Sequence, residues 1–522
     1  MQGEVRHHYM FHVTDQAQQI SYTRVEVEVP ILNYSFSEIE KVLMWIGKPP
    51  KDADEDADVP AYSFMLTTDS DVPRLKGVLT KVIFETNMKE DIERACERDD
   101  EGYLESQVVG DKVKPDVEMQ SVYKLEDFEF MDFDLTSFAG NSSQHDSDEE
   151  PEDLRKARKQ DFGLFDESEL DNSESLQAQS YDRTFIVSGP VVKVYKEAEN
   201  NAGHNLAFDM SFPIKTEEGE VIRPCNIMLH HNESQMIFCD SHDQSKMFNF
   251  DMERGKIVEE FVADSQKEIS SMRHITNKFK NAQSTSEQTF VGINDRAIFT
   301  IDPRINKKEK AAESKVYKTN PQFSQISTTF EGGLAIGSLS GEIRLYKQVG
   351  QNAKTLLPGL GDPIKAVDMS VDGNWIVATT QTYLLVIPTL CDNGKTGFDH
   401  RMGREKPNPL KLQVHVKDLA KYRINSLNFT PARFNNYNHS SGEHTSIVTS
   451  SGPYLFTWNF KKVKKGLLKA YQIKKIENWG NANHSVVDSQ FKFNNDEKIL
   501  VTEPKNIGVQ TRAMRKKIDN DV

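Results

Sequence analysis

The sequence predicts a mainly β protein, made of a small α+β module, an acidic linker and a seven-bladed β-propeller. Three observations lead to this fold class. The 522 residues are 37% hydrophobic, enough for two or three domains with buried cores. β-rich runs recur from Arg183 onward, and the charge divides sharply between the two halves. The predicted units are residues 1–100, 101–182 and 183–510, followed by a basic tail at 511–522.

The first unit, residues 1–100, combines strand and helix patterns. Residues 22–29 alternate, with Val25, Val27 and Val29 on one face and glutamates on the other, which is typical of a half-buried strand. A second strand is expected over 61–67, and apolar residues among charges over 76–97 predict an amphipathic helix. Strands followed by one helix indicate a small α+β module.

The acidic linker, residues 101–182, contains a candidate docking segment. Residues 1–182 carry 43 acidic and 18 basic side chains, a net of −25, whereas residues 183–522 carry a net of +9. Acidic and large apolar residues alternate over 126–135, a pattern of partner-docking segments in disordered chains, with Phe128, Phe130 and Phe133 as the docking residues. An edge strand packed on a core is the alternative. Ser147, in an acidic context, is a candidate phosphosite.

The back half repeats at the spacing of propeller blades. β-rich runs end at Tyr195, Phe250, Ile301, Tyr346, Ile387 and Trp458, and the first five lie 41 to 55 residues apart, where a four-stranded blade takes roughly 40 to 45. Turn pairs such as Asp372–Gly373 separate the strands within one period. Pairing the run 184–196 with the last run, 486–501, closes a ring of seven blades without sheet edges. Rings of six or eight blades and a two-sheet sandwich are the alternatives.

Motifs for catalysis, cofactors and metals are incomplete. Gly394–Thr396 ends like a phosphate-binding P-loop, but the first glycine of that motif is missing and no helix pattern follows. His230 and His231 are adjacent, so a strand directs them to opposite faces, and with His242 and Cys239 their spacing matches no structural zinc site. No GxSxG elbow occurs. We expect a protein that is not an enzyme and uses no cofactor and no metal.

Charged residues at the blade corners have two interpretations. Aspartates at strand ends are expected to accept hydrogen bonds from turn amides, because an unpaired buried backbone group costs roughly 1 to 3 kcal/mol; these are Asp251, Asp302, Asp368 and Asp372. Propeller loops also converge on one face and serve recognition. The candidate protein-binding rim is therefore Arg254, Arg304, Arg344 and Lys354, and the acidic stretch 126–134 is a candidate ligand in cis.

The sequence favours the cytoplasm. No apolar run approaches the ~18 to 20 residues that cross a bilayer, and the first residues lack a signal-peptide core. The four cysteines are too far apart in sequence for a disulfide framework. Basic residues stand in short clusters rather than along one face, so we expect no nucleic-acid partner. Residues 512–517 match a nuclear-import signal weakly and are interpreted as a solvated end, which leaves a nuclear presence open.

Long strings within residues 171–510 resemble one family. They include YDRTFIVSGPVVKVYK, DMERGKIVEE, STTFEGGLAIGSLSGEIRLY, NAKTLLPGLGDPIKAVDMSVDGNWIVATTQTYLLVI and HTSIVTSSGPYLFTWNF. The back half is similar to the carboxy-terminal domain of the vacuolar import and degradation protein twenty-seven (Vid27) family, whose plant relatives are the cypro-four-like or DEM proteins. The resemblance implies a WD-like propeller in a cytoplasmic protein connected to vacuolar import and degradation, with no established catalysis and a pleckstrin-homology-like module ahead of the acidic linker.

The predicted function is a non-catalytic cytoplasmic interaction scaffold. Its propeller is expected to bind protein segments of cargo or of degradation and trafficking factors, with a further contact in cis between linker and propeller. The alternative is a peripheral membrane adaptor that reads lipid through the N-terminal module. The net charge of −25 in the front half disfavours it, because anionic head groups repel acidic surfaces.

Overall fold

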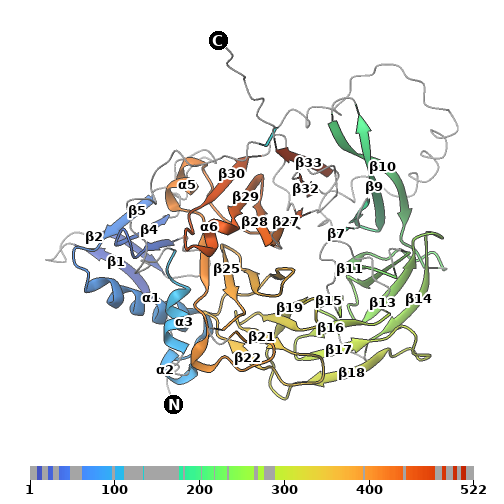
Figure 1. The fold of residues 1–522 in the computed structure, drawn as a ribbon, viewed down its shortest axis with the longest axis horizontal. Coiled ribbons are helices and arrows are strands. Elements are labelled where there is room, and N and C mark those ends of the chain that lie inside the picture. Colours follow the sequence, from blue (N-terminus) through green and yellow to red (C-terminus); the bar gives the residue numbers. More distant parts are fainter. Residues whose placement is uncertain are drawn as a thin grey trace, which may run out of the picture.

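A computed structural model describes residues 9–14, 21–26, 34–46, 61–96, 100–110, 133–134, 176–179, 183–200, 203–216, 218–231, 234–263, 268–275, 288–391, 394–438, 443–475, 485–488, 498–502 and 507–512. Seven four-stranded antiparallel sheets follow one another around a ring, and a small module of strands and helices lies outside it (Figure 1). The chain is mainly β, with the architecture of a WD40-like propeller.

The N-terminal module contains two small sheets and three helices. Its strands are β1 (Met10–Thr14), β2 (Ser21–Glu26), β3 (Tyr34–Ser37), β4 (Val42–Ile46) and β5 (Ala61–Met65), paired as β1–β2 and as β3–β4–β5. Its helices are α1 (Asp71–Met88), α2 (Ile92–Ala95) and α3 (Glu101–Ser106). β2 and β5 match the predicted strands. The predicted helix begins earlier than expected and breaks after Met88, where Lys89 takes a left-handed backbone that ends α1.

The first three blades take their strands in chain order. Blade one consists of β7 (Leu176–Gln179), β8 (Arg183–Ser188), β9 (Val191–Asn200) and β10 (Gly203–Pro213). Blade two consists of β11 (Pro224–His230), β12 (Gln235–Asp240), β13 (Lys246–Asp251) and β14 (Lys256–Val262). Blade three consists of β15 (Ser271–His274), β16 (Phe290–Asn294), β17 (Ala297–Ile301) and β18 (Ala311–Val316).

The next three blades follow the same plan. Blade four consists of β19 (Phe323–Thr328), β20 (Leu334–Ser338), β21 (Ile343–Tyr346) and β22 (Thr355–Leu357). Blade five consists of β23 (Ala366–Met369), β24 (Trp375–Thr379), β25 (Tyr383–Pro388) and β26 (Leu410–Gln413). Blade six consists of β27 (Arg433–Asn438), β28 (Glu443–Ser451), β29 (Tyr454–Asn459) and β30 (Tyr471–Lys475). The connections hold η7 (Gly403–Glu405), α5 (Val416–Lys421) and α6 (Phe460–Lys464).

The predicted repeat is confirmed, because each predicted run ends in the third strand of a blade. Those third strands are β9, β13, β17, β21, β25 and β29. The predicted turns contain glycines with positive φ, among them Gly341 (81°) and Gly373 (69°). A left-handed backbone at these positions favours glycine because a Cβ atom would clash there.

The seventh blade closes the ring differently from the prediction. It consists of β31 (Ser485–Asp488), β32 (Lys498–Thr502), β33 (Ile507–Arg512) and β6 (Phe133–Asp134). The predicted pairing of residues 184–196 with 486–501 is wrong, because blade one completes itself with β7 and β10. Blade seven instead takes its fourth strand from the region of the predicted linker, and its first strand, β31, contacts β7 to complete the ring.

Strand β4 fixes the N-terminal module on the outside of blade five (Figure 1). Its residues are buried on both sides, and alternate side chains face two different cores. Leu43 and Trp45 pack with α1 and α3, whereas Val42, Met44 and Ile46 belong to the cluster that contains β26 and α5. Full burial of each such side chain contributes roughly 1.5 to 3 kcal/mol. The module is therefore part of the propeller's packing.

No helix among the residues that the structure describes is long and apolar enough to span a membrane.

Candidate functional site

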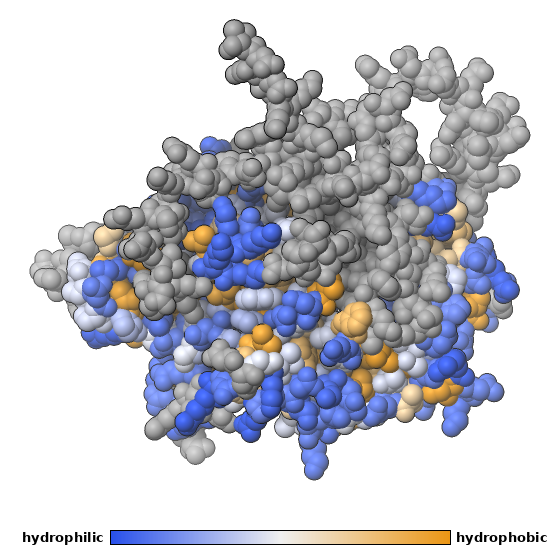
Figure 2. Space-filling model, viewed as in Figure 1, coloured by the Kyte–Doolittle hydropathy of each residue, from blue (hydrophilic) through white to orange (hydrophobic). Residues whose placement is uncertain are grey.

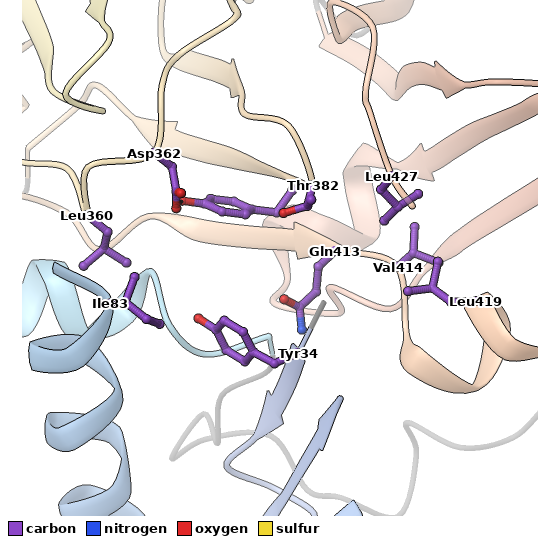
Figure 3. Close-up of a pocket in the computed structure, with 10 residues that line it drawn as sticks. Tyr34, Ile83, Leu360, Asp362, Thr382, Gln413, Val414, Leu419 and Leu427 are labelled. Atoms are coloured by element: carbon purple, nitrogen blue, oxygen red, sulfur yellow. Dashed lines mark hydrogen bonds between the residues drawn. The ribbon is translucent and has the colours of Figure 1, made fainter. Parts of the chain in front are cut away.

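A small pocket lies where the N-terminal module meets blade five. Figure 3 shows its lining residues, which include Tyr34 of β3, Ile83 of α1, Gln413 of β26 and Leu419 of α5. Its volume of about 20 Å³ is enough for one water molecule. Sites for cofactors and small substrates usually measure ~300 to 1,000 Å³. This pocket is a packing feature of the junction, too small for such a ligand.

Lys411 of β26 lies buried beside this pocket between two tyrosine rings. Its Nζ atom is 4.4 Å from the ring centre of Tyr34 and 4.6 Å from that of Tyr383. It donates a hydrogen bond to the Tyr34 hydroxyl at 3.0 Å. Burial lowers the pKa of Lys411 to about 7, although the charge of nearby Asp362 acts in the opposite direction. The module and blade five thus enclose one amino group in an aromatic cage.

Asp362, in the loop before β23, is the acidic member of the same junction. Its carboxylate accepts a hydrogen bond from the Tyr383 hydroxyl at 2.6 Å and another from the Asn87 side-chain amide at 3.3 Å. Burial raises the pKa of Asp362, whereas these hydrogen bonds and the charge of Lys411 lower it. Asp362 and Lys411, which both belong to the propeller, therefore favour each other's charged form where the propeller meets the module.

The loop between β22 and β23 is held by side chains of the module. The Asn87 amide donates to the Leu360 carbonyl at 2.8 Å, and the Gln107 amide donates to the Pro358 carbonyl at 2.8 Å. Gly361 has φ of 87°, and a Cβ atom there would stand 2.5 Å from the Cβ of Asn87. The Gly359–Gly361 motif is thus a tight loop at an interface, which makes the site architectural.

Three charged residues of the innermost strands lie close together. Arg433 of β27 places Nη1 3.6 Å from a carboxylate oxygen of Asp368 of β23, and the other oxygen accepts the Phe434 amide at 2.9 Å. Burial and the charge of Arg433 lower the pKa of Arg273 of β15 to about 10, against the effect of Asp368. Blades three, five and six are therefore linked electrostatically around one buried carboxylate.

The predicted structural role is confirmed for three of the four aspartates, whereas Asp368 lies within β23 and accepts the Phe434 amide of a neighbouring blade. Asp251 accepts the backbone amides of Glu253 and Arg254, both at 2.9 Å, and Asp302 accepts the amide of Arg304 at 3.0 Å. Asp372 accepts the Asn374 amide at 3.1 Å. Each carboxylate thus satisfies backbone groups that the turn leaves unpaired.

Three of the four predicted rim residues lie in turns on one face of the propeller, and the fourth, Arg344, lies within a strand. Successive antiparallel strands alternate in direction, so the turns between first and second and between third and fourth strands open on the same face, which we call face A. Arg254, Arg304 and Lys354 lie on face A, in the turns 252–255, 302–310 and 347–354. The Arg254 and Arg304 side chains are 70% and 64% exposed, and each pairs with the aspartate of its own turn. These three residues share a face on neighbouring blades.

Arg344 differs from the other rim candidates because it lies within β21. Its guanidinium is 5.5 Å from the ring centre of Tyr317 and 5.8 Å from that of Phe323, and it pairs with Glu342 at 3.1 Å. The side chain is 20% exposed. The structure gives Arg344 a packing role, and the rim as a protein-binding site stays a prediction for the other three.

Of the candidate docking segment, only Phe133 and Asp134 are among the residues that the structure describes. Phe133 and Asp134 form β6, where Phe133 is opposite Arg512 and Asp134 is opposite Thr511. The backbone at Phe133 therefore follows the edge-strand alternative. Phe128, Phe130 and the candidate phosphosite Ser147 lie outside the described residues.

The histidines and cysteines of the tested metal set lie apart. His230 stacks on His274, with ring centres 6.1 Å apart, while His242 contacts Asp240 of its own turn. Burial lowers the pKa of His230 to about 4. Cys239 lies opposite Cys225 across two strands. Within the described ranges, no three His, Cys, Asp or Glu side chains are grouped for a metal ion.

Sequence reasoning missed the aromatic cage around Lys411. In the sequence LKLQV, apolar and polar residues alternate, and this pattern predicts that the lysine faces solvent. Its partner Tyr34 is 377 positions away along the chain. Gly359 and Gly361, just before Asp362, are a local signal of this contact, because glycines allow a close approach of the backbone.

The comparison with protein families agrees with this architecture. A family described as VID27 C-terminal WD40-like domain matches residues 171–521. The chain is 32% identical over 379 residues to "Vacuolar import and degradation protein 27" of Schizosaccharomyces pombe, which covers 70% of this chain and 45% of that protein. The Saccharomyces cerevisiae protein of the same name is 32% identical over 346 residues, which covers 63% and 42%. The chain thus spans less than half the length of these relatives. A solved structure, "KlHsv2 with loop 6CD replaced by a Gly-Ser linker", aligns with a TM-score of 0.39 and 11% identity, over 64% of this chain and 89% of that chain.

Proposed function

The chain belongs to the VID27 family, and from this premise we propose that it is a non-catalytic cytoplasmic interaction scaffold in the vacuolar import and degradation of cytosolic cargo. The name that the two yeast relatives share supports the process. The propeller supports the mode of action, because its loops present broad faces for recognition. In this proposal the propeller binds protein segments of cargo or of trafficking factors.

Face A is the observation that carries the proposal. Besides the exposed arginines it presents Phe330, which is 51% exposed in the turn between β19 and β20, and Leu390, which is 45% exposed in the loop after β25. The Thr389 hydroxyl donates to the Gly373 carbonyl, and Gly373 lies against Thr329, so these two loops are neighbours. Exposed cations and exposed apolar side chains on one face suit a segment that mixes acidic and apolar residues.

Figure 2 supports recognition by small groups of side chains. On the face shown, the described surface is mostly hydrophilic, with apolar residues in small groups. Large continuous apolar patches mark obligate partners, whereas dispersed anchors among charges suit transient ones. We accordingly propose that the partners associate transiently.

The predicted linker bounds 101–182 are too wide, because α3 belongs to the module and β7 to blade one. The acidic chain between α3 and β7 is proposed to contact the propeller in cis. The pairing of β6 with β33 supports this contact, since it sets the backbone of Phe133 and Asp134, two residues of the alternating stretch, opposite Arg512 and Thr511. A strand added to a sheet edge gains backbone hydrogen bonds, and the side chains then provide specificity. The linker contact is on blade seven, away from the arginines of blades two and three.

Affinity purification from cells, with quantitative mass spectrometry, tests the function of face A. The full-length chain with Arg254→Glu, Arg304→Glu and Phe330→Asp should lose its specific partners by at least several-fold, because charge and anchor are both removed. Arg296→Glu is the matched control, since this exposed arginine lies in the turn between β16 and β17 on the opposite face. Recovery of the same partners by the triple variant and the wild type would reject face A.

The membrane adaptor remains a second hypothesis, with a pleckstrin-homology-like N-terminal module. The order of strands followed by α1 supports that module type, but its lysines are engaged by acids. Lys76 lies 3.2 Å from Glu38 and 3.1 Å from Glu105, and Lys41 lies 2.6 Å from Asp69. We expect the full chain to stay at the bottom of a flotation gradient with phosphatidylserine vesicles. Flotation with the vesicles would favour the adaptor.

A further inference from the structure

Cys225 of β11 and Cys239 of β12 face each other across blade two, and we propose that they form a reversible disulfide when the protein meets an oxidant. This modification site rests on the packing of blade two and is independent of the proposed scaffold function. The linear spacing of the cysteines gave no such indication, because the pairing depends on the strand register.

The backbone spacing at this pair matches a disulfide. Cys225 and Cys239 are direct partners in the antiparallel register. Two positions further along, the Ser241 amide donates to the Arg223 carbonyl at 2.8 Å, which marks a hydrogen-bonded pair. Such pairs recur at every second position, so Cys225 and Cys239 form another, with Cα atoms about 5.5 Å apart. Disulfides most often join Cα atoms roughly 5.5 to 6 Å apart.

Both thiols point to the same side of the sheet. Cys239 is fully buried in the apolar cluster between blades two and three, and Cys225 packs against that cluster while remaining partly exposed. Burial raises the pKa of Cys239, and the charges of Cys225 and Asp240 add to that effect, which agrees with the direct pairing of the two cysteines. In a hydrogen-bonded pair the Cβ atoms stand about 5.5 Å apart, whereas a disulfide needs roughly 3.5 to 4.5 Å. The two strands must therefore move closer locally as the bond forms, and the resulting disulfide is readily reduced.

The exposure of Cys225 makes it the first thiol to react. With hydrogen peroxide as the oxidant, the Cys225 thiolate attacks one oxygen, the O–O bond breaks, and a sulfenic acid and water result. The Cys239 sulfur then attacks the Cys225 sulfur, the S–S bond forms, and a second water leaves with the Cys239 proton. Two thiols and one peroxide thus give one disulfide and two waters.

The rate of the first step should depend steeply on pH. Burial, assisted by the charge of Asp240, raises the pKa of Cys225 to about 11. Because the thiolate is the reactive form, its fraction rises roughly tenfold per pH unit below that value. Oxidation between pH 7 and pH 9 should therefore accelerate by roughly 100-fold, a larger factor than for a thiol of ordinary pKa.

Peptide mapping of the full-length protein tests the pair. The chain is incubated with hydrogen peroxide under native conditions, free thiols are blocked with N-ethylmaleimide, and digested peptides are analysed by mass spectrometry. We expect one linked species, Cys225 to Cys239, with Cys96 and Cys391 blocked as free thiols after unfolding. Dithiothreitol should reverse the link.

Cysteine variants separate the proposed pair from random oxidation. Cys225→Ser and, independently, Cys239→Ala should each abolish the link, whereas Cys391→Ala, a buried cysteine outside blade two, should leave it intact. Cys225→Ser is the decisive variant because that site is partly exposed and tolerates a polar group. Two outcomes would overturn the proposal: Cys225 oxidised while Cys239 is recovered as a free thiol, or links that involve Cys96 as often as Cys239.

Discussion

At the scale of single residues, Lys411 shows how a charged group becomes part of a domain contact. A buried amino group is costly unless it is paired or neutral. The rings of Tyr34 and Tyr383 and the carboxylate of Asp362 supply partial compensation. Since these groups come from β3, β25 and the loop before β23, the protonation of one lysine is coupled to the docking of the whole module.

Lys411→Met should remove a pH dependence of stability between pH 7 and pH 9. In this range an unfolded lysine is protonated, whereas folded Lys411, with its pKa lowered to about 7, loses its proton. The unfolded state then binds more protons, so the free energy of unfolding rises with pH, by up to about 1.4 kcal/mol per pH unit for one group. Urea unfolding at several pH values measures the slope.

The exposed lysine Lys318 provides the control for this measurement. Lys318→Met should keep the wild-type slope, because its position in the loop before β19 is solvent-exposed. Equal slopes for wild type and Lys411→Met would show that Lys411 titrates as an ordinary lysine. The raised pKa values of Cys96 and Cys225 add a change of opposite sign that begins near pH 8, where unfolded thiols start to ionise. This change cancels in the comparison, because all three proteins contain both cysteines.

At the scale of elements, the loop between β22 and β23 links the propeller to α1. Gly361→Ala places a methyl group against Asn87 at a residue that also has a positive φ, so the module must shift or the loop must strain. We expect a loss of stability of about 2 kcal/mol or more. Thermal unfolding and limited proteolysis of the first 110 residues report the change.

Gly394→Ala is a matched control for the loop. Gly394 also has a positive φ, 77°, but a Cβ atom there would meet nothing within 4 Å. The two variants therefore share the backbone strain, and their difference isolates the contact with Asn87. Equal effects would mean that the loop does not hold the module.

At the same scale, some strands could be predicted from the sequence and others could not. The third strands, such as YLLVI in β25, were identifiable because they are apolar on both faces and end in bulky residues at a regular spacing. The outer strand β26 and the two-residue strand β6 have no such local signal. β26 pairs with β25 after the long connection 389–409, and β6 pairs with β33, whose residues are more than 370 positions away along the chain. A single sequence contains no trace of the second pairing.

At the scale of the whole molecule, module and propeller share a core and should unfold together. Met44 of β4 is 5% exposed in the cluster formed with blade five, whereas Met65 of β5 is 70% exposed. Met44→Asp should lower the melting temperature of the whole chain, since an unpaired buried charge costs about 3 kcal/mol or more. Met65→Asp should change stability by less than about 0.5 kcal/mol.

Scanning calorimetry on the full chain decides between shared and separate cores. One transition that moves as a unit in Met44→Asp is expected. A separate early transition for the module, with the propeller transition unchanged, would contradict the shared core. For the same reason, partner studies are better made with point variants of the full chain than with residues 183–522 alone, which lack the cover of blade five.

The shared core also has a consequence during synthesis, because residues that pack together are made at different times. β4 leaves the ribosome early, but α5, which covers Val42, Met44 and Ile46, ends at Lys421. At roughly 5 to 20 residues per second, the intervening chain takes roughly 20 to 75 s to make. Throughout that interval one apolar face of the nascent module has no native partner. The period of greatest aggregation risk for this protein therefore falls before its fifth blade is complete. Slower translation of the chain between β4 and α5 would prolong that period.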